Sequence, residues 1–129
     1  MYCINGDDSL CTSLKDEIPK HKKRDLSGIT IATHHGCHYC KVHYNDTLCG
    51  YRNPEVIDKI CEAMGVSALK WYDQKPRHCG GGFRQRYANR ELSLDATVDK
   101  FESLHRENVD VLLVMCPNCQ LQFDRYEQV

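Results

Sequence analysis

Three short apolar runs in this chain each lead directly into a loop that holds a cysteine, and this repeated arrangement constrains the fold most. The runs cover residues 29–33, 67–72 and 109–115, and β-branched or apolar side chains dominate the first and the last. Runs of this kind predict buried β-strands. Segments with helical spacing separate them, so we expect the order strand, loop, helix to occur three times.

The helical segments are marked by their ends. Asn53 and Pro54 are typical of a helix start, and Gly65 is typical of the residue that follows a helix. Pro117 is placed to open a final helix after the last strand. The long helix between the second and third strands is predicted to bury a face made of Ala96, Val98, Phe101, Leu104 and His105.

Strands that alternate with helices predict an α/β fold, here a three-layer βαβαβα unit with a small parallel sheet and right-handed crossovers. We divide the chain into a lead-in over 1–27, partly helical or irregular, and a domain over 28–129. A weak helix ending at Pro19 is expected in the lead-in. The loops that follow parallel strands meet at the carboxyl edge of the sheet, where binding sites are built. That edge would collect Cys37, His78, Cys79, Cys116 and Cys119.

The chain has nine cysteines in 129 residues, an odd number that a set of disulfides does not explain. Its N-terminus lacks the basic and apolar regions of a secretory signal, so we expect a cytoplasmic protein. Thiols stay reduced in the cytosol, and a pattern of this kind there more often indicates metal binding or thiol chemistry. The cysteines are Cys3, Cys11, Cys37, Cys40, Cys49, Cys61, Cys79, Cys116 and Cys119.

Charge and hydropathy exclude two classes of partner. The formal net charge is −1, which removes the electrostatic case for nucleic-acid binding. No apolar stretch approaches the ~20 residues that a membrane-spanning helix needs. We therefore expect a protein without a membrane span that does not bind nucleic acid.

Two Cys-x-x-Cys pairs bear on the chemistry of the site. The pair Cys116 and Cys119 lies at a predicted helix N-terminus, where the helix dipole favours thiolates that bind a metal or cluster. The glycines after Cys79 would let the backbone approach a bulky inorganic group. The pair Cys37 and Cys40 lies after the first strand. A single Cys-x-x-Cys fits zinc ribbons, thioredoxin-like dithiols and iron–sulfur proteins alike, so spacing alone does not choose among them.

Four motifs together resemble a known family. They are 36–38, with the sequence Gly-Cys-His, then 53–65, then 78–82, with the sequence His-Cys-Gly-Gly-Gly, and 116–121, which begins Cys-Pro-Asn-Cys. This set resembles the cysteine-rich CCG domain, which is duplicated in the B subunit of heterodisulfide reductase and also occurs in the E subunit of some archaeal succinate dehydrogenases. The resemblance covers about residues 28–126 and is greatest to the second copy.

The resemblance implies a noncubane [4Fe–4S] cluster held by five family cysteines, whose positions fall on Cys37, His78, Cys79, Cys116 and Cys119. This sequence has His78 where the family has the first cysteine of an adjacent pair. Imidazole ligates iron in some clusters and also suits zinc, so Zn²⁺ is the alternative cofactor. Cys40 could supply the missing thiolate, although a spectator thiol in a helical turn is the slightly favoured interpretation.

The remaining cysteines are expected to be unpaired surface or core thiols, and most of the remaining histidines to be polar loop residues or residues that support the ligands. Cys61 lies on an apolar helix stripe and is expected to be a small buried hydrophobe. None of the histidines near Cys37 is expected to be a primary ligand; they are His34, His35, His38 and His43. Cys3, Cys11 and Cys49 lie outside the family pattern.

The resemblance also implies a function and partners. We expect an iron–sulfur domain of a heterodisulfide reductase-like oxidoreductase, which transfers electrons or reduces disulfides. Its partners would be other subunits of a redox complex, including a second CCG domain and an iron–sulfur electron donor. The alternatives are a structural zinc module that docks partner subunits without catalysis, and a metal-free thiol protein.

Overall fold

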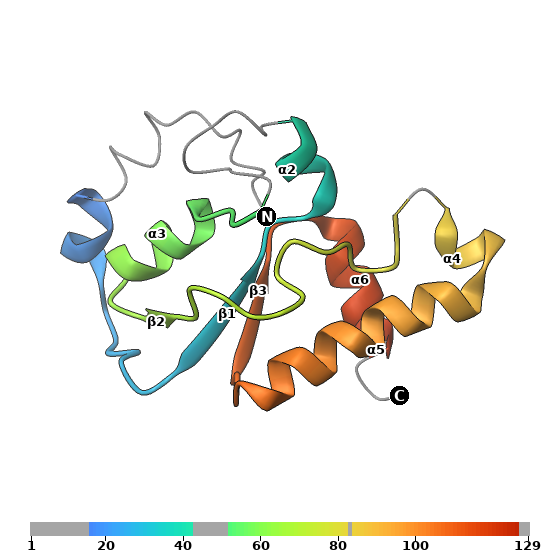
Figure 1. Cartoon of the computed structure of the whole chain (residues 1–129). Helices are drawn as coiled ribbons and strands as arrows, with labels where there is room; N and C mark the ends of the chain where they lie inside the picture. The colour runs from blue at the N-terminus through green and yellow to red at the C-terminus, as the bar shows by residue number, and fades with distance from the viewer. Residues whose placement is uncertain (1–15, 43–51, 83, 127–129) are drawn as a thin grey trace.

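The computed structural model describes residues 16–42, 52–82 and 84–126, and it has an α/β fold built on a small parallel sheet (Figure 1). The strands are β1 (Thr30–His34), β2 (Ser67–Ala68) and β3 (Val111–Val114). They are ordered β2-β1-β3, and β1 pairs in parallel with both neighbours. The predicted fold class is confirmed.

Helices cover both faces of this sheet. Figure 1 shows α3 on one side of the strands and α5 with α6 on the other. The helical segments are η1 (Ile18–His21), α2 (Cys37–Val42), α3 (Val56–Ala63), α4 (Gln85–Ala88), α5 (Arg90–Arg106) and α6 (Pro117–Tyr126). None of the helices in these ranges is long and apolar enough to cross a membrane.

The two faces of the sheet bury separate apolar clusters because side chains alternate along each strand. Ile31 and Leu113 face α3, where they pack with Ile57 and the fully buried Cys61. Ala32 and Leu112 face the opposite side and pack with Leu104 of α5 and with its neighbours. The interpretation of Cys61 as a buried hydrophobe is therefore confirmed.

The strand order places a topological switch point at the carboxyl ends of β1 and β3. After β1 the chain continues to β2 on one side of β1, and it later crosses to β3 on the other side. The loops that follow β1 and β3 therefore leave two adjacent strands in different directions. His34 and Val114 are partners in the last step of the ladder, and the Met115 N–H donates to the His34 carbonyl oxygen at 3.2 Å. Ligand sites of open parallel sheets form at such points.

Several local expectations differ from the structure. Helix α3 begins at Val56 with Glu55 as its N-cap residue; the Asn53 Oδ1 caps no N–H of the described residues, and the Asn53 amide nitrogen donates to the Glu55 carboxylate at 3.2 Å. Strand β2 ends at Ala68, and the chain then turns so that the Tyr72 hydroxyl donates to the Thr33 carbonyl oxygen. Asp16 and Glu17 are helical, and Pro19 lies in the first turn of η1, which follows them; the rest of the helix expected before Pro19 lies outside the described residues.

The predicted buried face of the long helix is confirmed for Phe101 and Leu104, which pack in the core, and is wrong for Val98 and His105. Val98 is 41% exposed and His105 is exposed, whereas α5 buries polar residues along one side. Its buried residues are Ser93, Thr97, Lys100, Ser103 and Leu104. The reason is that the inner side of α5 packs against backbone carbonyl groups and thiols, which need hydrogen-bond donors and charge more than apolar surface.

Candidate metal centre

Three buried side chains from distant parts of the sequence meet at the carboxyl edge of the sheet. They are His34 at the end of β1, Cys79 in the loop before α4, and Cys119 in the first turns of α6. One ring nitrogen of His34 and the two Sγ atoms all lie within 4.8 Å of one another. Imidazole nitrogen and thiolate sulfur at this spacing are a donor set that suits zinc or an iron–sulfur group.

Cys116 and Cys37 adjoin this group. The Cys116 thiol interacts with that of Cys119 one helical turn away. Gly36, which precedes Cys37, lies so near that a Cβ on it would be 3.1 Å from the Cys116 Cβ and 4.0 Å from its Sγ. The loop after β1 therefore packs directly on the start of α6. Cys37 and Cys116 are both partly exposed, whereas Cys79 and Cys119 are buried.

The side chains of Cys79 and Cys119 are hydrogen-bonded to each other. Hydrogen bonding between the two thiols lowers the pKa of Cys79 well below its ordinary value and, together with burial, raises the pKa of Cys119. The Gly81 N–H adds a contact at 3.4 Å to the Cys79 Sγ, which also favours the thiolate. One sulfur of the pair is therefore poised as an anion, the form that binds metals.

Two buried bases lie beside these thiols. Burial lowers the pKa of His34 to about 4, so its imidazole is neutral near pH 7. Lys100 of α5 is fully buried, and its Nζ lies 3.4 Å from the His34 Nδ1. Burial lowers the pKa of Lys100 to about 8, while the sulfurs of Cys79, Cys119 and Cys37 act in the opposite direction. The amine thus stands within electrostatic reach of three of the predicted ligands.

The loop that holds Cys79 is anchored by its carbonyl groups. The Thr97 hydroxyl donates to the Cys79 carbonyl oxygen at 2.9 Å, and the Ser93 hydroxyl donates to that of Gly80 at 3.0 Å. The Asn118 amide donates to the carbonyl oxygen of Gly81 at 2.8 Å. Three consecutive carbonyls are therefore fixed by side chains of α5 and α6, which sets the position of Cys79 relative to Cys119.

Gln122 of α6 connects these anchors. Its amide nitrogen donates to the Ser93 and Thr97 hydroxyls at 3.1 and 3.0 Å, and its amide oxygen accepts from the Arg86 Nε at 2.9 Å. Arg86 also donates to the Asn118 side chain at 3.2 Å. Gln122 is fully buried, so each of its bonds replaces one that water would otherwise make.

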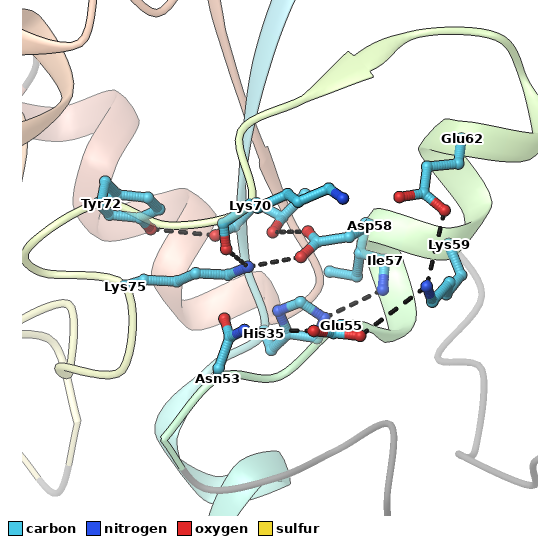
Figure 2. Close-up of polar contacts among 11 residues, drawn as sticks. His35, Asn53, Glu55, Ile57, Asp58, Lys59, Glu62, Lys70, Tyr72 and Lys75 are labelled. Carbon is cyan, nitrogen blue, oxygen red and sulfur yellow. Dashed lines mark hydrogen bonds and ion pairs between the residues drawn. The ribbon is translucent and has the colours of Figure 1, made fainter.

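A second buried polar network lies on the α3 side of β1 (Figure 2). The Lys75 Nζ lies 2.5 Å from a carboxylate oxygen of Asp58 and donates to the Lys70 carbonyl oxygen at 2.8 Å. The other Asp58 oxygen accepts from the Thr33 hydroxyl. The His35 Nε2 accepts from the Ile57 N–H at 3.0 Å. This network holds the last residues of β1 against α3 and so supports the loop that carries Cys37.

The other predicted residues do not belong to the buried group of His34, Cys79 and Cys119. His78 is exposed, and its Nδ1 accepts a hydrogen bond from the Gly80 N–H at 3.1 Å. Cys40 is buried within α2, as expected for a thiol in a helical turn. His38 is exposed and His35 belongs to the α3 network. Cys3, Cys11, Cys49 and His43 lie outside the described residues.

Sequence reasoning missed Lys100 and Gln122, and it grouped His34 with the loop histidines. A usable signal for α5 was present, because Ser93, Thr97 and Lys100 recur at helical spacing. A polar stripe on a helix is ordinarily interpreted as its solvent face. Only the position of the Cys79 loop shows that this stripe is the inner one.

Comparison with known proteins found a matching family and several relatives. Residues 31–124 match the cysteine-rich CCG domain family. The B subunit of the ferredoxin:CoB-CoM heterodisulfide reductase of Methanosarcina acetivorans is 43% identical over 114 residues, which cover 88% of this chain and 36% of that protein. A protein of Archaeoglobus profundus, named as similar to the B subunit of heterodisulfide reductase, is 30% identical over 84% of this chain and 37% of its own length.

A more distant relative has another name. The 8-methylmenaquinol:fumarate reductase membrane anchor subunit of Wolinella succinogenes is 23% identical over 88% of this chain and 39% of that protein. The chain thus spans less than two fifths of the length of these three relatives.

Proposed function

This chain belongs to the cysteine-rich CCG domain family, and on that premise we propose that it is the iron–sulfur domain of a heterodisulfide reductase-like oxidoreductase. The observation that carries the proposal is the buried group of His34, Cys79 and Cys119 at the switch point of the sheet. Its reaction class is disulfide reduction, in which two electrons from a donor subunit and two protons convert a disulfide into two thiols.

The residues present fit an inorganic cofactor. Four cysteines of the family pattern surround one edge of the sheet, and they are Cys37, Cys79, Cys116 and Cys119. The buried His34 Nε2 has no hydrogen-bond partner among the described residues, which suits a side chain whose partner is a bound group. We propose these thiolates as ligands of a [4Fe–4S] cluster, which would supply one-electron chemistry next to the disulfide.

The fifth family position falls on His78. We retain His78 as a candidate ligand, with Cys40 as the alternative source of a thiolate. For His78 to bind a metal, its exposed ring has to turn toward the thiols and give up the bond from the Gly80 N–H. A His78→Ala variant that keeps the metal of the wild type would remove this residue from the ligand set, and Cys40→Ser tests the alternative in the same way.

The partners follow from the length of the relatives. The chain spans less than two fifths of three relatives, and two of these are named as the B subunit of a heterodisulfide reductase or as similar to it. We therefore propose that a second CCG domain and an electron-donor subunit complete the active complex. A cytoplasmic location is part of the same proposal.

A structural zinc module is the second candidate. The observation that favours it is the imidazole of His34 beside two thiols, because three thiolates with one imidazole are an ordinary zinc set. In that case the chain would dock partner subunits and have no redox activity of its own.

Anaerobic purification followed by metal analysis tests both proposals. Brown protein with iron and acid-labile sulfide supports the cluster, and colourless protein with stoichiometric zinc supports the second candidate. Cys119→Ser should lose most of the metal. Cys61→Ala is a matched control, because Cys61 is equally buried but lies on the α3 side of the sheet. Wild-type protein without iron or zinc would refute both.

A further inference from the structure

Two lysines are buried in this domain, and they differ in their counter-ions. Lys75 is 2% exposed and lies against the carboxylate of Asp58 (Figure 2). Lys100 is 0% exposed, and no carboxylate of the described residues lies within ion-pair distance of it. A buried ammonium group without an anion is costly, so proteins almost always pair one. The anion that balances Lys100 has to come from somewhere else.

The surroundings of Lys100 identify where that anion lies. Its Nζ donates to the Gln74 carbonyl oxygen at 2.5 Å and lies 5.5 Å from the centre of the Tyr72 ring, which fixes the amine at the inner side of α5. The sulfurs of Cys79, Cys119 and Cys37 stabilise its positive charge, and the Arg77 guanidinium opposes it. All three cysteines are predicted metal ligands, and they belong to three different segments. A metal or cluster held by these thiolates carries net negative charge.

Lys100 also orients His34. An ammonium group has only donors, so at 3.4 Å from the Nδ1 it makes this nitrogen an acceptor and leaves the ring proton on the Nε2. The Nε2 is buried and has no acceptor among the described residues. A thiolate or cluster sulfur beside it would be that acceptor, because a ring nitrogen of His34 and the sulfurs of Cys79 and Cys119 lie within 4.8 Å.

We propose that Lys100 is the counter-charge of the metal centre: a positioning residue that stabilises its negative charge through space and directs the His34 N–H toward its sulfur atoms. This inference rests on the proposed function, since it needs a metal bound by the thiolates. A nearby positive charge stabilises the more negative, reduced state of a cluster and raises its reduction potential. It likewise stabilises a zinc–thiolate complex, whose net charge is negative. In the zinc case the His34 Nε2 carries no proton and binds the metal, so only the through-space part of the proposal applies.

The test compares Lys100→Met and Lys100→Arg with the wild type, each purified without oxygen. Lys59→Met is the control for the loss of one positive charge, because Lys59 is partly exposed on α3, on the other side of the sheet. If the wild type holds a cluster, its reduction potential is measured by a redox titration monitored through visible absorbance. The equilibrium constant for reduction should be about tenfold smaller in Lys100→Met than in the wild type. For one electron this corresponds to a reduction potential lower by ~59 mV. Lys100→Arg and Lys59→Met should stay within about threefold of the wild type.

If the wild type holds zinc, competition with a zinc chelator replaces the redox titration, and Lys100→Met should lose zinc about tenfold more readily. Equal values for Lys100→Met and the wild type would overturn the inference while leaving the proposed function intact. An Arg variant as impaired as the Met variant would also overturn it, because packing and not charge would then be responsible. Wild-type protein without metal would end both proposals. Should Lys100→Met fail to fold by circular dichroism, Lys100→Gln takes its place.

Discussion

Gly80 lies against Ser93 so closely that a Cβ added to it would overlap the Ser93 carbonyl oxygen. Its φ is +90°, in the region that favours glycine. Both facts have one cause: the loop after Cys79 is pressed onto α5 so that the Ser93 hydroxyl reaches the Gly80 carbonyl oxygen. The glycine run of this loop therefore serves close packing of backbone on helix as well as the approach to a cofactor.

Gly80→Ala should destabilise the protein by more than ~2 kcal/mol, because the backbone has to leave its conformation and α5 has to move away. The displaced Cys79 should also hold metal less well. Gly82→Ala is the control in the same loop, since a Cβ there meets nothing within 4 Å, and its effect should stay within about 1 kcal/mol. Chemical denaturation and metal analysis measure both quantities. Equal losses in the two variants would show that the Gly80 contact does not matter.

Gln122 is the next residue on which the position of Cys79 depends. Gln122→Ala removes one hydrogen-bond partner from each of Ser93, Thr97 and Arg86. The Nε of the buried Arg86 then lacks its acceptor. We expect a loss of about 3 kcal/mol in the free energy of unfolding. Gln120→Ala on the exposed side of α6 should change it by less than about 0.5 kcal/mol. A small effect of Gln122→Ala would mean that water replaces its side chain.

The sequence was sufficient to predict the fold because the signals were local. The strand runs at 29–33 and 109–115 correspond to β1 and β3 within two residues, and Gly65 follows α3 with a φ of +73° as expected. Parallel topology then requires the loops after the strands to share one edge. The proximity of Cys79 to Cys119 follows from that topology, although 40 positions separate them in the chain.

The interior of the site could not be predicted in this way, because its partners are distant in sequence. Nothing near Lys100 indicates that its side of α5 faces sulfur, and His34 resembles any polar residue at the end of a strand. His78 is a candidate because it falls on a family cysteine position, and its side chain is exposed whereas that of the adjacent Cys79 is buried. Neighbours in sequence on an extended loop point in different directions, which only the three-dimensional structure shows.

The buried pair of Lys75 and Asp58 should behave differently from the exposed pairs on the same helix. Lys75→Met alone leaves the Asp58 carboxylate buried with only the Thr33 hydroxyl, and we expect a loss of about 3–5 kcal/mol. Lys75→Met combined with Asp58→Leu should recover most of this loss, because two apolar side chains replace two charges.

The matched comparison uses Lys59 and Glu62, whose nearest charged atoms are 3.7 Å apart on the surface of α3. Their double-mutant cycle should give less than about 1 kcal/mol. Urea denaturation of the single and double variants measures both cycles. A buried pair with a coupling energy as small as that of the exposed pair would contradict its proposed role in supporting β1.

Cys61 gives a pH dependence that is separate from the metal centre. Burial raises the pKa of its thiol from 9.0 to about 11. The unfolded chain loses this proton near pH 9 while the folded chain retains it, so deprotonation favours unfolding as the pH rises from 9 to 11. The contribution of Cys61 to stability is fully present below pH 9 and falls by about 2–3 kcal/mol across this window.

Since lysines and tyrosines titrate in the same range, the quantity to measure is the difference in the free energy of unfolding between the wild type and Cys61→Ala. That difference, obtained from denaturation curves at several pH values, should shrink between pH 9 and 11. A constant difference would show that the Cys61 thiol is not shielded from water between α3 and the sheet.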